Sequence, residues 1–236
     1  MWFGYMNRNY EEELDIAVGA DNAFEPGGDR GQPTHFTTRR HKDVFKVTVP
    51  KEFGDKQLVW KLTRHGHTEQ VVATLKPVWQ IDRLRTTRGG NSEQVSSNLP
   101  PVVKVEAVNP SGSVATLTLS ATDDGLPARR GAPAGLTVFW AKFRGPGSVQ
   151  FSEREAKLAN GKATSSATFS EPGDYILQAV VDDGSGESAG NFGYHCCWTN
   201  TQVRISVKSA PQSTVPDPQS AIRNPQSAVP NPQSAA

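Results

Sequence analysis

Two Asp-Asp-Gly turns are the residues of this sequence best suited to bind a metal ion. Asp123 and Asp124 follow one predicted strand, and Asp182 and Asp183 follow another. In a seven-strand antiparallel sandwich these two strands run in the same direction, so the loops after them share one end of the domain. Asn98 leads into the first strand at that end, and Ca²⁺ prefers cages of roughly six to eight oxygen ligands. The sequence therefore predicts a calcium site formed by these side chains.

The same two turns also have a simpler interpretation. Asp accepts backbone N–H hydrogen bonds within turns, and Gly adopts positive φ at no steric cost. Asp-Asp-Gly then closes a strand without any ion. Both interpretations stay open, and no other cofactor is expected.

The only two cysteines of the chain, Cys196 and Cys197, are neighbours, with His195 before them and Trp198 after them. Three consecutive residues rarely converge on one ion, and no C-x-x-C spacing is present, which disfavours a metal site. A strained vicinal disulfide and a pair of buried free thiols are the main alternatives. The sequence leaves their redox state open.

Other catalytic signatures are missing. No G-x-S-x-G or G-x-G-x-x-G in a strand–helix context occurs, and the sequence contains neither an H-E-x-x-H motif nor a P-loop. Glu11, Glu12 and Glu13 are interpreted as a solvated charge run. The sequence predicts no enzyme; a catalytic site would need paired carboxylates or a histidine under the long 19–40 loop. Four of the five histidines lie in the first third of the chain: His35, His41, His65 and His67.

The strands that would position these residues show a period of two. Between Leu136 and Ala141, Trp140 shares one face with Leu136 and Val138. Tyr175 opens a second strand with the same alternation. A Trp on one central strand and a Tyr at the corner before another are typical of an immunoglobulin-like sandwich.

The predicted fold is all-β, with two antiparallel sandwich-like domains. Residues 1–82 form a small antiparallel domain with a tight hairpin at His65-Gly66-His67, and residues 99–208 form a seven-strand sandwich. Residues 83–98 are polar and contain Gly and Ser, as linkers do. Residues 209–236 repeat Pro-Gln-Ser every seven residues, which predicts a disordered tail because proline prevents a helix.

Residues 98–208 resemble the PKD-like and Ig-like domains of bacterial surface proteins, most closely over 98–184. The resemblance rests on Asn98-Leu99-Pro100-Pro101, Asp123-Asp124-Gly125-Leu126-Pro127, Pro172-Gly173-Asp174-Tyr175 and Asp182-Asp183-Gly184. It implies an Ig-like fold, and it ends before the Gly-Tyr-His-Cys-Cys segment. The N-terminal half resembles uncharacterised bacterial proteins that share a Gly-Gln-Pro-Thr-His-Phe loop, which implies no activity.

Charge and hydropathy narrow the class of protein. The chain has 25 basic and 24 acidic residues, a net charge of +1, which argues against nucleic acid or an anionic membrane as the main partner. No window approaches the ~20 apolar residues of a membrane helix. The chain begins without a leader-like segment, and we expect Met1 to lie inside a longer gene product.

From these observations we expect a non-catalytic, extracytoplasmic module of a bacterial protein, structural or adhesive, whose partner is a protein or polysaccharide at the cell surface. The alternative is a carbohydrate-binding accessory module. Sugars stack on exposed aromatic rings, for which Trp2, Trp79 and Trp198 are the candidates. Trp60 and Trp140 are expected in the core.

Overall fold

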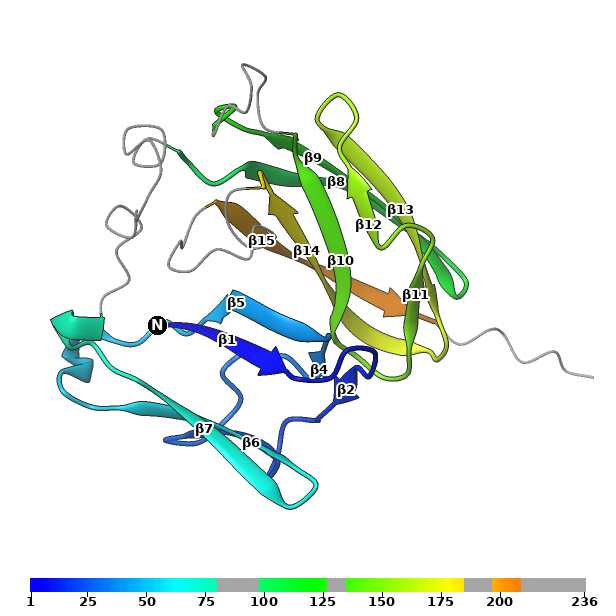
Figure 1. Cartoon of the computed structure of the whole chain (residues 1–236). Helices are drawn as coiled ribbons and strands as arrows, with labels where there is room; N and C mark the ends of the chain where they lie inside the picture. The colour runs from blue at the N-terminus through cyan, green and yellow to red at the C-terminus, as the bar shows by residue number, and fades with distance from the viewer. Residues whose placement is uncertain (80–97, 127–134, 185–196, 209–236) are drawn as a thin grey trace, which may run out of the picture.

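The computed structural model describes residues 1–79, 98–126, 135–184 and 197–208 (Figure 1). These residues form antiparallel strands with two short 3₁₀ turns, so the predicted all-β, sandwich-like fold is confirmed. The expected tail and all of the expected linker except Asn98 lie outside the described residues. The 3₁₀ turns are η1 (Lys51–Phe53) and η2 (Pro77–Trp79).

Two four-stranded sheets pack face to face in the second half of the chain. One sheet has the order β12-β10-β14-β15, with β12 (Glu155–Lys157), β10 (Thr137–Arg144), β14 (Gly173–Asp182) and β15 (Trp198–Val207). The other has the order β11-β13-β9-β8, with β11 (Val149–Phe151), β13 (Lys162–Phe169), β9 (Val114–Thr122) and β8 (Val102–Ser111). The described residues thus hold eight strands here rather than the expected seven. The added strand is β12, which pairs with β10 and has too few apolar residues to show a period.

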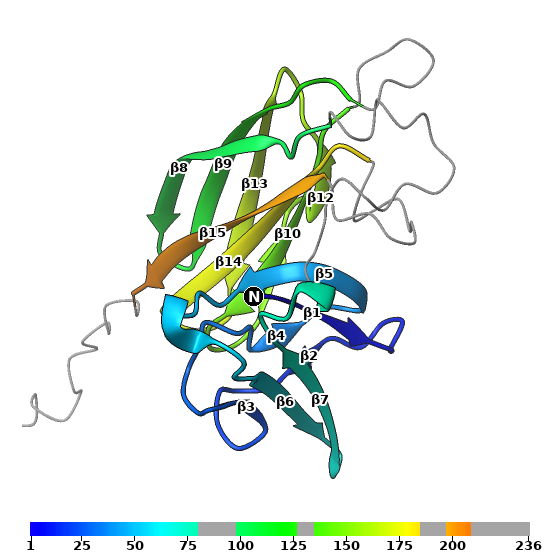
Figure 2. The same cartoon turned by 90° about the vertical axis from the view of Figure 1, so that its left-hand side faces the viewer.

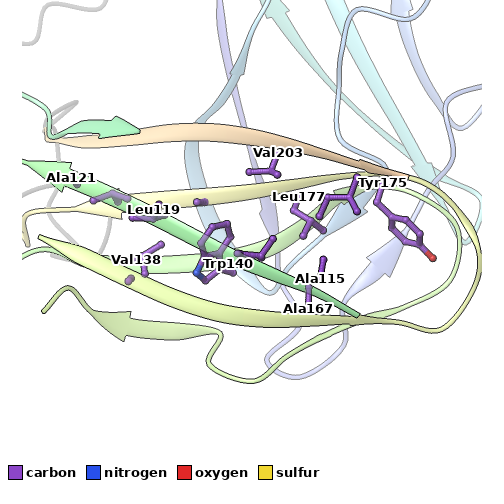
Figure 3. Close-up of a cluster of buried hydrophobic side chains, with 14 of the residues drawn as sticks. Ala115, Leu119, Ala121, Val138, Trp140, Ala167, Tyr175, Leu177 and Val203 are labelled. Atoms are coloured by element: carbon purple, nitrogen blue, oxygen red, sulfur yellow. The ribbon is translucent and has the colours of Figure 1, made fainter. Parts of the chain in front are cut away.

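The sandwich core lies between these sheets and is centred on Trp140, which is fully buried (Figure 3). Leu177 and Val203 point into the same core from β14 and β15. The Tyr175 hydroxyl donates a hydrogen bond to the Glu171 carbonyl oxygen at 2.8 Å, as expected for the corner before this strand. The ring of Tyr175 packs so close to Gly145 that a Cβ there would lie 2.3 Å from it. Only glycine fits at this crossing.

The N-terminal unit is built from short strands around an aromatic core. A two-stranded sheet pairs β1 (Trp2–Asn7) with β5 (Arg39–Lys46), and a three-stranded sheet has the order β3-β6-β7. The latter contains β3 (Asn22–Glu25), β6 (Leu58–Arg64) and β7 (His67–Ala73), and a third pair joins β2 (Leu14–Asp15) to β4 (His35–Phe36). Phe3, Phe24, Phe45 and Trp60 form the centre, with the Phe3 and Phe24 ring centroids 5.1 Å apart.

Two local expectations for this unit have different outcomes. The hairpin tip is confirmed: Arg64 pairs with His67, and His65 and Gly66 take φ of 53° and 74°, as a two-residue type I′ turn requires. Residues 19–40 are not one long loop, because β3 and β4 lie within them. Strands of two to four residues are too short to show a period, so no pattern in the sequence indicates them.

The N-terminal unit covers the outer face of the β12-β10-β14-β15 sheet (Figure 2). Trp140 points into the sandwich, whereas Phe143, three positions later on β10, belongs to the core of the N-terminal unit. Ile176 on β14 packs against that same core. Strands β10 and β14 are therefore covered on both faces, and the two units are in direct contact.

We predict that Trp140→Ala lowers the free energy of unfolding by about 3–5 kcal/mol, because it removes a fully buried large aromatic side chain. Trp2→Ala is the matched control, since Trp2 is partly exposed, and should cost less than about 1 kcal/mol. Chemical denaturation of the three proteins measures both values. Equal losses would show that Trp140 is not the centre of the core.

Candidate functional site at the junction of the two units

The two Asp-Asp-Gly turns and the segment before β8 meet at one end of the sandwich, as the strand directions predict. Asn98 Nδ2 donates to Asp183 Oδ2 at 2.9 Å, and the Leu99 backbone N–H donates to Asp124 Oδ2 at 2.9 Å. The N-terminal segment of the sandwich is thus tied to both turns.

Most of these carboxylates also accept hydrogen bonds within their own turns. Asp123 accepts from the Gly125 N–H at 2.9 Å, Asp124 from Leu126 at 2.9 Å, and Asp182 from Gly184 at 2.5 Å. This is the pattern of turn chemistry. Among the residues that the structure describes, no group of three or more His, Cys, Asp or Glu side chains is arranged to hold an ion.

One oxygen in these turns is unusual. Asp123 Oδ1 is buried and accepts no hydrogen bond from the residues that the structure describes. Burial, with the charge of Asp124 adding to it, raises the pKa of the Asp123 carboxyl. A buried carboxylate oxygen with no donor is relieved either by a proton or by a cation. Calcium binding by Asp123, Asp124, Asp182 and Asp183 therefore stays a prediction.

Cys197 is buried and disulfide-bonded. Its Sγ lies 3.3 Å from the Asn98 carbonyl oxygen, next to the turns. Cys196, the other cysteine of the chain, lies outside the described residues. Of the three alternatives for Cys197, the free thiol and the metal ligand are excluded.

A chain of five side chains, alternately basic and acidic, crosses the junction of the two units, and we call it the junction ion network. His35 lies at its centre, with Nε2 2.9 Å from Glu13 and Nδ1 3.0 Å from Asp15. On the sandwich side, Arg154 lies 2.5 Å from Glu13 and Lys142 lies 2.8 Å from Asp15. Each of the two carboxylates of the N-terminal unit thus contacts one basic side chain of the sandwich.

His35 lies between two carboxylates in this network. Each of its two ring nitrogens is within hydrogen-bond distance of one of them. Glu13 is the better-defined partner: its hydrogen bond from His35, supported by Arg154, lowers its pKa to about 2. Charge-assisted hydrogen bonds of this kind are stronger than neutral ones.

A second ionic contact joins the units at the end of β10. Both terminal nitrogens of Arg144 donate to the Asp29 carboxylate, at 2.6 and 2.7 Å, and Nε donates to the Gln32 carbonyl oxygen at 2.6 Å. The bidentate hydrogen bond with Arg144 lowers the pKa of Asp29 to about 2. Beside it, the Thr34 N–H donates to the Phe143 carbonyl oxygen at 2.9 Å. The 19–40 segment is thus held to the sandwich through main chain and side chain together.

Amide side chains of the sandwich make the remaining polar contacts across the junction. Gln178 donates to the Val44 carbonyl oxygen at 3.0 Å, and Asn200 donates to the Asp43 carbonyl oxygen at 2.7 Å. Between them lies a cavity of about 20 Å³, lined in part by His35 and His41. A cavity of this volume has room for about one water molecule.

Burial dominates the ionisation of the groups around this cavity. It raises the pKa of Tyr5 to about 12 and lowers the pKa of His41. Thr37 connects the two, because its hydroxyl lies 3.0 Å from the Tyr5 hydroxyl and 2.8 Å from His41 Nε2. Both rings are held neutral, and the arrangement supports packing rather than proton transfer.

Sequence reasoning missed most of the junction residues. Glu13 was expected in a solvated run, yet it binds His35 and Arg154. One signal pointed to a covered face: Phe139, Ala141 and Phe143 make the second face of β10 as apolar as the first. Strands of this kind are buried on both sides.

The exposed aromatic side chains differ from expectation at one position. Trp79 is 71% exposed and Trp2 43%, but Trp198 is only 7% exposed, so its prediction as an exposed ring is wrong. Trp198 lies instead under the N-terminal unit, with Lys42 Nζ 5.3 Å from the centre of its ring. Trp60 and Trp140 are buried, as expected.

No known protein-family model matches this sequence, including those of the PKD and Ig families. Among solved structures, the chain is similar to a conjugative transposon lipoprotein from Bacteroides eggerthii DSM 20697. The two are 16% identical with a TM-score of 0.30, over 44% of this chain and 95% of that chain. So low a similarity carries no conclusion about activity or partners.

We predict that the junction makes the protein acid-labile through Glu13. The folded-state pKa of Glu13 is about 2 against an ordinary value of 4.5, so its contribution is complete above about pH 4.5 and is lost as the pH falls toward 2. Glu13→Gln should therefore lower the melting temperature at pH 7 and flatten its decline between pH 5 and about pH 2.5. Thermal unfolding followed by circular dichroism across this range measures both effects.

Glu11→Gln is the matched control, because Glu11 is an exposed carboxylate of the same segment. It should melt like the parent at every pH. If Glu13→Gln behaves like Glu11→Gln, the junction ion network does not contribute to stability.

The two interpretations of the Asp-Asp-Gly turns differ in one measurement. If they bind calcium, millimolar Ca²⁺ should raise the melting temperature above its value in EDTA. The free energy of unfolding should rise by about 2.7 kcal/mol when Ca²⁺ is in hundredfold excess over Kd. Asp123→Asn should abolish that difference. Identical melting in EDTA and in Ca²⁺ would leave turn chemistry as the whole explanation.

Proposed function

We propose that this protein is a non-catalytic extracytoplasmic module, structural or adhesive, in which the sandwich and the N-terminal unit act as one rigid body. The observation that carries the proposal is the covered face of the β12-β10-β14-β15 sheet. There Phe143 enters the core of the N-terminal unit, and Arg144 binds Asp29 beside it. Contacts of this kind fix the angle between two units.

The absence of catalysis is part of the proposal. The sequence allows a catalytic site only beneath the 19–40 segment, and the cavity there measures about 20 Å³, which is too small to surround a substrate. The acids and bases next to it bind one another, as the His35 contacts to Glu13 and Asp15 illustrate. This arrangement supports a stabilising role for these groups.

One observation supports an extracytoplasmic location. Cys197 is disulfide-bonded, and disulfides persist in oxidising compartments outside the cytosol. Separately, none of the helices in the described part of the chain has the length and apolar character needed to cross a bilayer. The near-zero net charge fits a protein or polysaccharide partner at the cell surface.

The finer assignment to an Ig-like or PKD-like domain is supported by the architecture. Two packed four-stranded antiparallel sheets surround a central Trp140, and Tyr175 makes the corner hydrogen bond. A carbohydrate-binding accessory module is the second candidate, favoured by the 71% exposure of Trp79. Neither Trp79 nor Trp2 lines a described pocket, so we place this candidate second.

NMR relaxation of backbone amides tests the rigid body. We expect one rotational correlation time for amides of β9 in the sandwich and β6 in the N-terminal unit. The double variant Phe143→Ser/Arg144→Ala should give two shorter times, because it removes the shared core residue and the Asp29 contact. Lys157→Ala, an exposed change on β12, is the control.

Two different correlation times in the unaltered protein would overturn the rigid-body part of the proposal.

The location is tested separately by fractionating the cells that make the protein and trapping free thiols with a maleimide. We expect the protein outside the cytosol, without free thiols. A reduced protein in the cytosolic fraction would overturn the location.

A further inference from the structure

A groove of about 340 Å³ opens on the N-terminal unit, on a different surface from the junction. It lies between β1 and the β6–β7 hairpin, since residues of both line it. Its apolar surface comes from Leu14, Ile16, Phe36, Trp60 and Leu62. The junction contacts and the proposed rigid body make no use of this groove.

Strand edges border the groove. β7 is the last strand of the β3-β6-β7 sheet, and in the described part of the chain β1 pairs with β5 alone. Consecutive residues from Gly4 to Arg8 line the groove, so the backbone of β1 itself forms one wall. Edge strands present unpaired N–H and C=O groups to any extended chain that reaches them.

The exposure of β7 is unusual for a strand. All of its residues from His67 to Val72 are exposed, including two adjacent valines, Val71 and Val72. Met6 is similarly exposed on the facing strand β1. Half-exposed apolar side chains on an open edge mark a surface that another strand can cover.

The groove also carries an unbalanced charge. Arg8 and Arg64 line it, and neither has an ion-pair partner among the described residues. Glu69 also lines the groove, with its carboxylate 3.1 Å from His67 Nε2, so the two arginines outnumber the one carboxylate. An occupant with carboxylates would complement both arginines, which bind carboxylates in a bidentate manner.

We propose that this groove binds an extended acidic peptide segment of a partner protein, which adds as a β-strand along the open edge of β7. Alternating side chains of the peptide would place apolar groups toward the groove and carboxylates toward Arg8 and Arg64. The inference goes beyond the proposed rigid module and does not depend on its location.

Two other occupants fit less well. A sugar needs exposed ring faces, but Trp60 and Phe36 in this groove are buried. A second copy would pair the same surface with itself, which would bring four arginines, Arg8 and Arg64 of each copy, to one interface with only the two Glu69 carboxylates to oppose them. An acidic peptide satisfies the open edge, the apolar surface and the cations together.

The test uses the whole chain and a displayed library of random twelve-residue peptides. Selected peptides should alternate apolar residues with Asp or Glu, and they should protect the amides of Thr68–Ala73 from hydrogen exchange. Arg8→Glu/Arg64→Glu should weaken their binding about tenfold or more, because a charge-assisted hydrogen bond contributes roughly 1.5–3 kcal/mol. Lys51→Glu/Lys56→Glu, exposed and outside the groove, is the matched control and should bind normally.

Several results would overturn the inference. They are a library from which no peptide is enriched, peptides that bind both double variants equally, and protection that maps outside β7. A dimer of the free protein in light scattering, dissociated by Val71→Lys, would assign the edge to a second copy instead. Retained circular dichroism and melting of each variant exclude loss of folding as the cause.

Discussion

The fold depends on the burial of both faces of β10 and β14. One face fills the sandwich with Trp140 and Leu177, and the other carries Phe143 and Ile176 into the N-terminal unit. Each unit thereby covers an apolar surface of the other that would otherwise be exposed to water. Burying a large aromatic side chain contributes about 1.5–3 kcal/mol, so this shared sheet outweighs any single surface contact.

Polar groups at the junction add orientation to this apolar contact. Surface ion pairs contribute about 0–1 kcal/mol. Here Lys142 and His35 are nearly excluded from water, whereas their partner Asp15 is 62% exposed. Burying the Lys142 charge is costly unless it finds a partner. The alternating order from Arg154 to Lys142 supplies those partners in a single relative position of the two units, so it selects the geometry more than it adds stability.

The sandwich could be predicted from the sequence, but its contacts with the N-terminal unit could not. Trp140 and Tyr175 could be assigned because strand periodicity and corner chemistry are local. The contacts of Arg144 with Asp29, and of Arg154 with Glu13, join residues more than a hundred positions apart, and no local pattern encodes such a pairing. The burial of Trp198 escaped for the same reason, since it depends on the neighbouring unit. Strand β4 escaped because its two residues, which pair with β2, are too few to show a period. The meeting of the two Asp-Asp-Gly turns was predictable, because strand direction alone requires it.

The position of Phe143 has a consequence for the order of events during synthesis. The N-terminal unit leaves the ribosome first, but one of its core side chains is supplied by β10, which follows only after the whole of β7, β8 and β9. Domains otherwise fold as they emerge, and contacts between distant parts of a chain form slowly. The first 79 residues must therefore wait, with an incomplete aromatic core and the open edge of β7, until the sandwich has begun to form around Trp140. A chaperone that acts during synthesis would meet the protein in this partly folded state.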